Sequence, residues 1–132
     1  MKQLTLGDLS IDVDTAAPGA IHLRWRGRSN NQNPATTLQP FLELQLAHAR
    51  QRGVRVEMHF EELTYFNSST IAVLLHGIQE AHARTVPLVL HYDRRLRWQA
   101  HNFEALRVLQ STDDLLRLDG GAGEINPTPR RS

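Results

Sequence analysis

Three stretches of the chain alternate apolar and polar residues, which is the pattern of a strand that buries one face. In the first, Ile21, Leu23 and Trp25 alternate with polar neighbours, and the second and third cover residues 54–60 and 86–92. Residues 4–13 predict a further strand region with a turn near Gly7 and Asp8. Clean alternation indicates one covered face and one face toward water. The positions expected on the open face are His22, Arg24, Arg26, Arg55, Glu57, His59 and His91.

The segments between these strands follow a helical period. Residues 37–52, 69–84 and 96–109 each carry an apolar stripe with i, i+3, i+4 spacing, which predicts three amphipathic helices. Pro40 fits the first of these only within its first turn. Residues 113–118 predict either a short helix or an edge strand.

The order of these elements predicts one α/β domain. Strands that alternate with helices imply crossover connections and hence a largely parallel sheet. Because strands covered on both faces would read as continuous apolar runs, we expect a single mixed, largely parallel sheet with helices packed on one face. This domain spans residues 1–118, and the Gly- and Pro-rich residues 119–132 are predicted to form a loose tail.

Composition narrows the function classes. The 132 residues include 15 Lys and Arg against 14 Asp and Glu, a net charge of +1 that gives no general attraction to nucleic acid. The chain has no cysteine, so disulfides and thiolate metal sites are excluded. Neither a signal-peptide pattern nor a run of 18 apolar residues is present, so we expect a cytoplasmic protein without membrane insertion.

The most informative residues lie where the second helix is predicted to begin. Asn67, Ser68, Ser69 and Thr70 place four small oxygen-bearing side chains after a strand expected to end near Phe60. Such side chains cap a helix by accepting hydrogen bonds from the N–H groups of its first turn, and capping alone explains them. A second interpretation is that one hydroxyl accepts a phosphate, because exposed N–H groups and the helix dipole stabilise an anion there.

The sequence from Val54 to Leu118, which contains this junction, resembles the STAS family of anti-sigma factor antagonists, and the resemblance covers roughly residues 4–118 in all. That family has a strand, a D-S-[ST]-G junction and a helix with a paired-leucine core, and here FEELTYFNSSTIAVLL has the same order. Asn67 stands at the acidic position and Thr70 at the glycine position. The chain also resembles SiaC-type regulatory phosphoproteins, in which a Ser or Thr follows Asn at this junction.

The resemblance implies a phosphorylatable protein-binding switch of the partner-switching type. It places the phosphorylation site at Ser68 and the partner-binding surface on Asn67, Ser68, Ser69, Thr70, Val73 and Gly77. Val73 and Gly77 are expected to form an exposed, partly apolar strip beside Ser68. The partners implied are a regulatory protein of the anti-sigma, Ser/Thr kinase type and a phosphatase.

Other chemistry has weaker support in the sequence. The seven histidines show no i, i+4 pair and no H-E-x-x-H motif, so no metal site is predicted, although His59 and His91 could approach each other on adjacent strands. Glycine-rich phosphate loops and paired catalytic acids are missing, so we expect no cofactor and no enzyme activity. Two rivals stay open: a STAS subunit of a transporter or sensory complex that is not phosphorylated, and a small hydrolase on the same layer.

Overall fold

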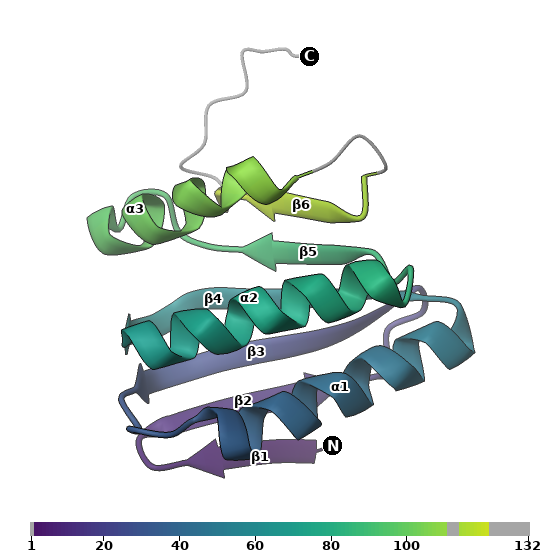
Figure 1. The fold of residues 1–132 in the computed structure, drawn as a ribbon, viewed down its shortest axis with the longest axis horizontal. Coiled ribbons are helices and arrows are strands. Elements are labelled where there is room, and N and C mark those ends of the chain that lie inside the picture. Colours follow the sequence, from purple (N-terminus) through teal and green to yellow (C-terminus); the bar gives the residue numbers. More distant parts are fainter. Residues whose placement is uncertain (1, 111–113, 122–132) are drawn as a thin grey trace.

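The computed structural model describes residues 2–110 and 114–121. They form a six-stranded sheet with helices along it (Figure 1). The elements in chain order are β1 (Lys2–Leu6), β2 (Leu9–Asp14), β3 (Ala20–Ser29), α1 (Ala35–Arg52), β4 (Arg55–Phe66), α2 (Ser68–Ala83), β5 (Leu88–His91), α3 (Arg97–Ala105), the short 3₁₀ helix η1 (Leu106–Leu109) and β6 (Leu116–Asp119).

The sheet is mixed but mostly parallel, as predicted. Its spatial order follows the sequence, β1-β2-β3-β4-β5-β6. The β1–β2 and β2–β3 pairs are antiparallel, whereas the three pairs from β3 to β6 are parallel. The first hairpin turns at Gly7 and Asp8, where the sequence placed it. Near it, Gly27 has a φ of +90°, and an added Cβ would lie 2.1 Å from the Asp8 carbonyl oxygen.

The helices lie on one face of the sheet (Figure 1). In β3, Ile21, Leu23 and Trp25 are fully buried beneath them, while the alternating polar residues lie on the other face. The one-sided layer predicted from the strand alternation is therefore confirmed. None of the described helices has the length and apolar content needed to cross a membrane.

Strand β4 departs from the prediction in a way that positions the second helix. It does not end near Phe60 but continues to Phe66. Its register against β3 shifts between the Arg24–His59 and Arg26–Glu62 pairs, which is a β-bulge. A bulge changes the direction of the side chains that follow it. Leu63 and Phe66 follow this bulge, and both are buried in the core.

A buried side chain of α3 satisfies the carbonyl groups around this bulge. Gln99 is fully buried, and its Nε2 donates to the carbonyl oxygens of Phe60 (2.7 Å) and Leu63 (2.9 Å). Its Oε1 accepts from the backbone N–H of Asp93 at 2.7 Å. Because buried backbone groups without partners are costly, Gln99 stabilises the irregular end of β4.

Aromatic packing then fixes where β4 leaves the sheet. The Phe66 ring contacts Trp98 and Phe103 edge-on, with centroid distances of 5.2 and 5.6 Å. Phe103 is fully buried and also stacks on Tyr92 at 5.3 Å. The residue immediately before the Asn67 junction is thus held against α3.

The structure settles three smaller expectations. Pro40 lies in the second turn of α1, because that helix begins at Ala35 rather than at residue 37, and the proline is exposed. The segment left open between helix and strand contains β6, which pairs with β5 at the sheet edge. Asp119, predicted to begin the tail, is the last residue of β6, and residues 122–132 lie outside the described residues.

Candidate functional site

Asn67 caps α2 and turns the chain out of β4. Its extended backbone (φ −93°, ψ 175°) places its side chain beside the first helical turn. Asn67 Oδ1 accepts hydrogen bonds from the N–H of Thr70 at 2.9 Å and from the Thr70 hydroxyl at 2.8 Å. Both groups belong to the first turn, so the capping predicted for this junction is present.

Further hydrogen bonds tie the junction to the loop after β3. The backbone N–H of Asn67 donates to the Ser29 carbonyl at 3.1 Å, and Asn67 Nδ2 donates to the Asn31 carbonyl at 2.9 Å. The Thr70 hydroxyl lies 2.7 Å from the Ser29 hydroxyl. Asn67 is therefore held from both sides, and the start of α2 has one defined position.

The three hydroxyl residues after Asn67 differ in exposure. Ser68, the first residue of α2, is exposed, Ser69 is half-buried, and Thr70 is 0% exposed. Thr70 was predicted to contact a partner, and its complete burial rules out that role for its side chain. Ser68 carries the most accessible hydroxyl of the three.

The electrostatic setting at Ser68 favours an added anion. Helix geometry leaves the first N–H groups, those of Ser68 and Ser69, without carbonyl partners inside the helix, and the helix dipole is positive at that end. The first turn of α2 contains no acidic residue. A phosphate on Ser68 would meet a weakly positive field there.

The predicted docking strip along α2 is wrong in its residues. Val73 is 1% exposed and Gly77 is buried, because this side of α2 packs on α1. A Cβ added at Gly77 would lie 3.6 Å from Leu42 Cδ1 of α1. The buried face of α2 keeps Leu74, Ile78 and Ala81 but extends to Val73 and Gly77.

The surface of α2 that faces solvent instead runs from Ser68 through Ala72 to Gln79. These three residues are exposed, and Leu75 and His76 between them are half-buried. We call these five residues the α2 outer stripe. His76 Nε2 lies 3.0 Å from Glu43 Oε2 of α1, so this edge of the stripe is fixed to the neighbouring helix.

An apolar groove adjoins the α2 outer stripe. It has a volume of about 510 Å³ and lies between α2, η1 and the β5–β6 edge of the sheet. Leu75 and Gln79 belong to both the stripe and the groove, so the surface is continuous from Ser68 to the groove. Its lining includes Leu75, Ile78, Gln79, Leu109, Leu115 and Leu116. Leu109 is 41% exposed, which makes this an accessible apolar surface.

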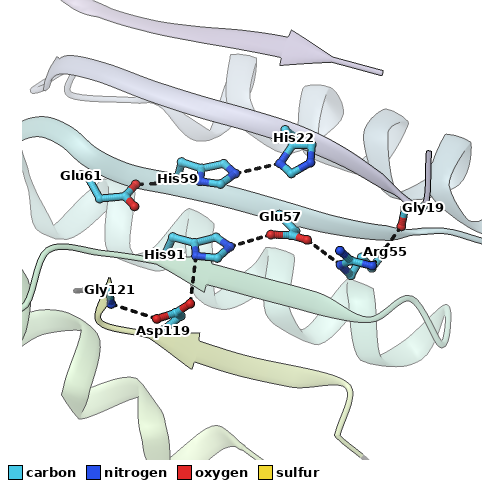
Figure 2. A network of polar contacts seen from close by, with 9 residues as sticks. All are labelled: Gly19, His22, Arg55, Glu57, His59, Glu61, His91, Asp119 and Gly121. Carbon is cyan, nitrogen blue, oxygen red and sulfur yellow. Dashed lines mark hydrogen bonds and ion pairs between the residues drawn. The ribbon is translucent and has the colours of Figure 1, made fainter. Parts of the chain in front are cut away.

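The opposite face of the sheet carries the residues that could hold a metal ion. Within the described part of the chain, two sets bring their ligand atoms within 4.8 Å of one another. They are His22, Glu57 and His59, and His59, Glu61 and His91. The sequence predicted no such site, since His22, His59 and His91 belong to three different strands and meet only through strand pairing (Figure 2).

Comparison of the sequence with protein-family models and with curated proteins finds no match. Among solved structures, the fold matches an anti-sigma factor antagonist from Mycobacterium paratuberculosis with a TM-score of 0.58 at 13% identity, over 85% of this chain and 95% of that one. The chain therefore has the STAS fold. The phosphorylated form of the Bacillus cell fate determinant SpoIIAA matches with a TM-score of 0.51 at 12% identity, over 86% of this chain and 94% of that one. The predicted α/β architecture and STAS resemblance are confirmed at the level of the fold.

Proposed function

We propose that this STAS-fold chain is a regulatory protein of the partner-switching type, whose binding to a partner is controlled by phosphorylation of Ser68. The unmodified chain binds through the α2 outer stripe and the adjoining groove. A phosphate on Ser68 abolishes that binding. In this account the protein acts by association in the cytoplasm, as an anti-sigma factor antagonist does, and performs no catalysis of its own.

The observation that supports this proposal most directly is the exposure of Ser68 at the start of α2. Phosphorylation adds a charge of about −1.5 to −2 at neutral pH. At a helix N-terminus the fold itself tolerates this charge, because the dipole and the N–H groups stabilise it. A partner seated on an apolar surface beside Ser68 would instead have to desolvate the phosphate, so association becomes unfavourable.

The resemblance to anti-sigma factor antagonists implies the classes of partner. The phosphate would come from a Ser/Thr protein kinase of the anti-sigma type, which would also be the protein that docks on α2. A phosphatase restores the binding form. The structure of SpoIIAA in its phosphorylated form supports a phosphate on this fold. No cofactor takes part.

A capture experiment with matched variants tests the proposal. Wild-type, Ser68→Asp and Ser68→Asn proteins are immobilised and incubated with lysate from the source cells, and retained proteins are identified by mass spectrometry. The expected result is one regulatory protein retained by wild type and by Ser68→Asn but lost with Ser68→Asp. Since Asn and Asp have nearly the same shape, the difference isolates charge. Equal retention by all three proteins would contradict control by charge at Ser68.

A second candidate function follows from the two positions at which the Asn67 junction differs from the STAS family pattern. Asn67 occupies the family's acidic position, and Thr70, in place of glycine, is buried in a hydrogen-bond network with Ser29. This arrangement favours a STAS subunit that is never phosphorylated and binds constitutively within a transporter or sensory complex. Phosphate-affinity gels of protein from cells separate the two functions. A single unmodified band under all growth conditions favours the constitutive subunit.

A further inference from the structure

Three histidines lie side by side on the open face of the sheet (Figure 2). They are His22 on β3, His59 on β4 and His91 on β5. The His59 and His91 rings are nearly parallel, with centroids 4.4 Å apart and an interplanar angle of 3°. The His22 and His59 rings lie 5.1 Å apart at 26°. Parallel pairing of neighbouring strands therefore builds a histidine row that no single segment of the sequence contains.

The closest approach within this row joins two ring nitrogens. His22 Nδ1 lies 2.8 Å from His59 Nε2, a distance at which one proton is shared between them. One ring nitrogen each of His22 and His59 and one carboxylate oxygen of Glu57 also lie within 4.8 Å of one another. Two imidazole nitrogens and one carboxylate oxygen are a donor set typical of zinc sites. We propose that His22, Glu57 and His59 form a binding site for a divalent transition-metal ion, with zinc as the expected ion.

A metal ion binds a histidine ring through a nitrogen that carries no proton. An ion would replace the proton between His22 and His59. The two nitrogens would then separate to about 3.3 Å, because bonds of about 2.0–2.1 Å meet at a tetrahedral angle.

Surrounding groups orient the proposed ligands. Glu57 is held from one side by Arg55, with Nε 2.5 Å from Glu57 Oε2, and from the other by His91, with Nε2 2.6 Å from Glu57 Oε1. The second nitrogen of His91 lies 3.4 Å from Asp119 Oδ2. Each carboxylate oxygen has two lone pairs, so these contacts leave room for an ion. Partners of this kind raise metal affinity by fixing the ligands in place.

The same surroundings select the kind of ion. Arg55 offsets the charge of Glu57, so attraction between opposite charges contributes little. Calcium and magnesium, which need several oxygen ligands, find one carboxylate here. Imidazole nitrogens suit zinc, copper and nickel. With three protein ligands on a sheet face without covering helices, the fourth position is available to water.

The second set, His59, Glu61 and His91, competes for the same histidine. His59 Nδ1 lies 3.9 Å from Glu61 Oε1, farther than the 2.8 Å between His22 and His59. The Glu61 side chain is 43% exposed, against 11% for Glu57. The first set contains the two ring nitrogens that lie 2.8 Å apart and the less exposed carboxylate, so we place the ion there and give His91 a positioning role.

Zinc titration of the full chain tests the site. Calorimetry of metal-free wild type is expected to show one zinc ion per chain, and His59→Gln and His22→Gln are each expected to weaken binding at least 100-fold. His91→Gln removes only a positioning residue, so a loss of about 10-fold is expected. The matched control is His101→Gln, which removes an exposed histidine on α3 and should leave binding unchanged.

Three results would overturn the proposal. The first is zinc binding by wild type no tighter than by His59→Gln. The second is retained binding in His22→Gln with loss in His91→Gln, which would move the ion to the other set. The third, independent of whether variants fold, is a visible spectrum of Co²⁺-loaded wild type identical to that of hydrated Co²⁺. Circular dichroism of each variant confirms that lost binding is not lost structure.

Discussion

At the scale of single residues, Asn67 provides the cap of α2 and Ser68 provides an exposed hydroxyl. Asn67 fixes the start of α2 through its contacts with Thr70 and Asn31. This leaves the Ser68 side chain without a structural role in the cap. A hydroxyl that the fold does not need can be modified at little cost to folding. The division supports Ser68 as the regulated residue.

Replacing Ser68 by Asp should change regulation and not stability. An acidic side chain in the first helical turn contributes about 0.3–1 kcal/mol of stabilisation through the helix dipole. We therefore expect Ser68→Asp to unfold in urea at the same denaturant concentration as wild type or slightly higher. Ser68→Asn is the uncharged control. A large drop in the midpoint for Ser68→Asp alone would show that this position cannot carry an anion.

Replacing Asn67 by Ala should lower stability. Loss of an N-cap costs about 0.5–2 kcal/mol, and the Thr70 hydroxyl loses one of its partners as well. Asn67→Asp is the control, because its carboxylate can still cap Thr70 but cannot donate to Asn31. Chemical denaturation should rank the proteins as wild type, then Asp, then Ala. An Ala variant as stable as wild type would mean that Asn67 does not hold the junction.

At the scale of elements, strand alternation predicted which face of the sheet is buried. The helical pattern did not predict the buried face of α2 correctly. Alternation has a period of two, so Ile21, Leu23 and Trp25 could share only one face. In α2, small and apolar residues extend around much of the helix, and the face that packs on α1 depends on a neighbour far away in sequence. The β4 bulge could not be predicted from its own segment either, because Gln99 of α3 donates the hydrogen bonds to its carbonyl groups.

Gly77 tests the corrected face of α2. A Cβ at Gly77 would already contact Leu42, so the two further methyl groups of Gly77→Val should separate α1 from α2. Overpacking of this kind costs about 1–3 kcal/mol. Ala72→Val is the control, since it places the same side chain on an exposed position of the same helix. Thermal denaturation should show a lower midpoint for Gly77→Val only. Equal midpoints for the two variants would contradict the burial of Gly77 against α1.

At the scale of the whole molecule, the two faces of the sheet serve different purposes. The covered face holds the core and supports α2, while the open face carries a charged network from β2 to β6. The strand alternation predicted which residues lie on that face but not their contacts, since the distance between His22 and His59 depends on strand register. The fold and the junction were thus predictable from local patterns, and the histidine row was not.

The open face predicts how stability depends on pH. The folded-state pKa of His59 is lowered to about 4 from an ordinary value of 6.5, through burial and the nearby His91, His22 and Arg24. Between these values the unfolded chain binds the proton and the folded chain does not, so stability falls as the pH drops from 6.5 toward 4. Glu57 and Glu61 also face this ring. His59→Gln should flatten the profile of unfolding free energy across that window, and an unchanged slope would contradict the assignment.

The proposed switch depends on Ser68 carrying the phosphate in cells. The most direct measurement is phosphopeptide mapping by mass spectrometry of the protein isolated from its own cells in several growth states. We predict phosphate on Ser68, with an occupancy that changes between growth states, and an unmodified Thr70 because that side chain is buried. A phosphate on Thr70, or unmodified Ser68 in every growth state, would contradict the switch.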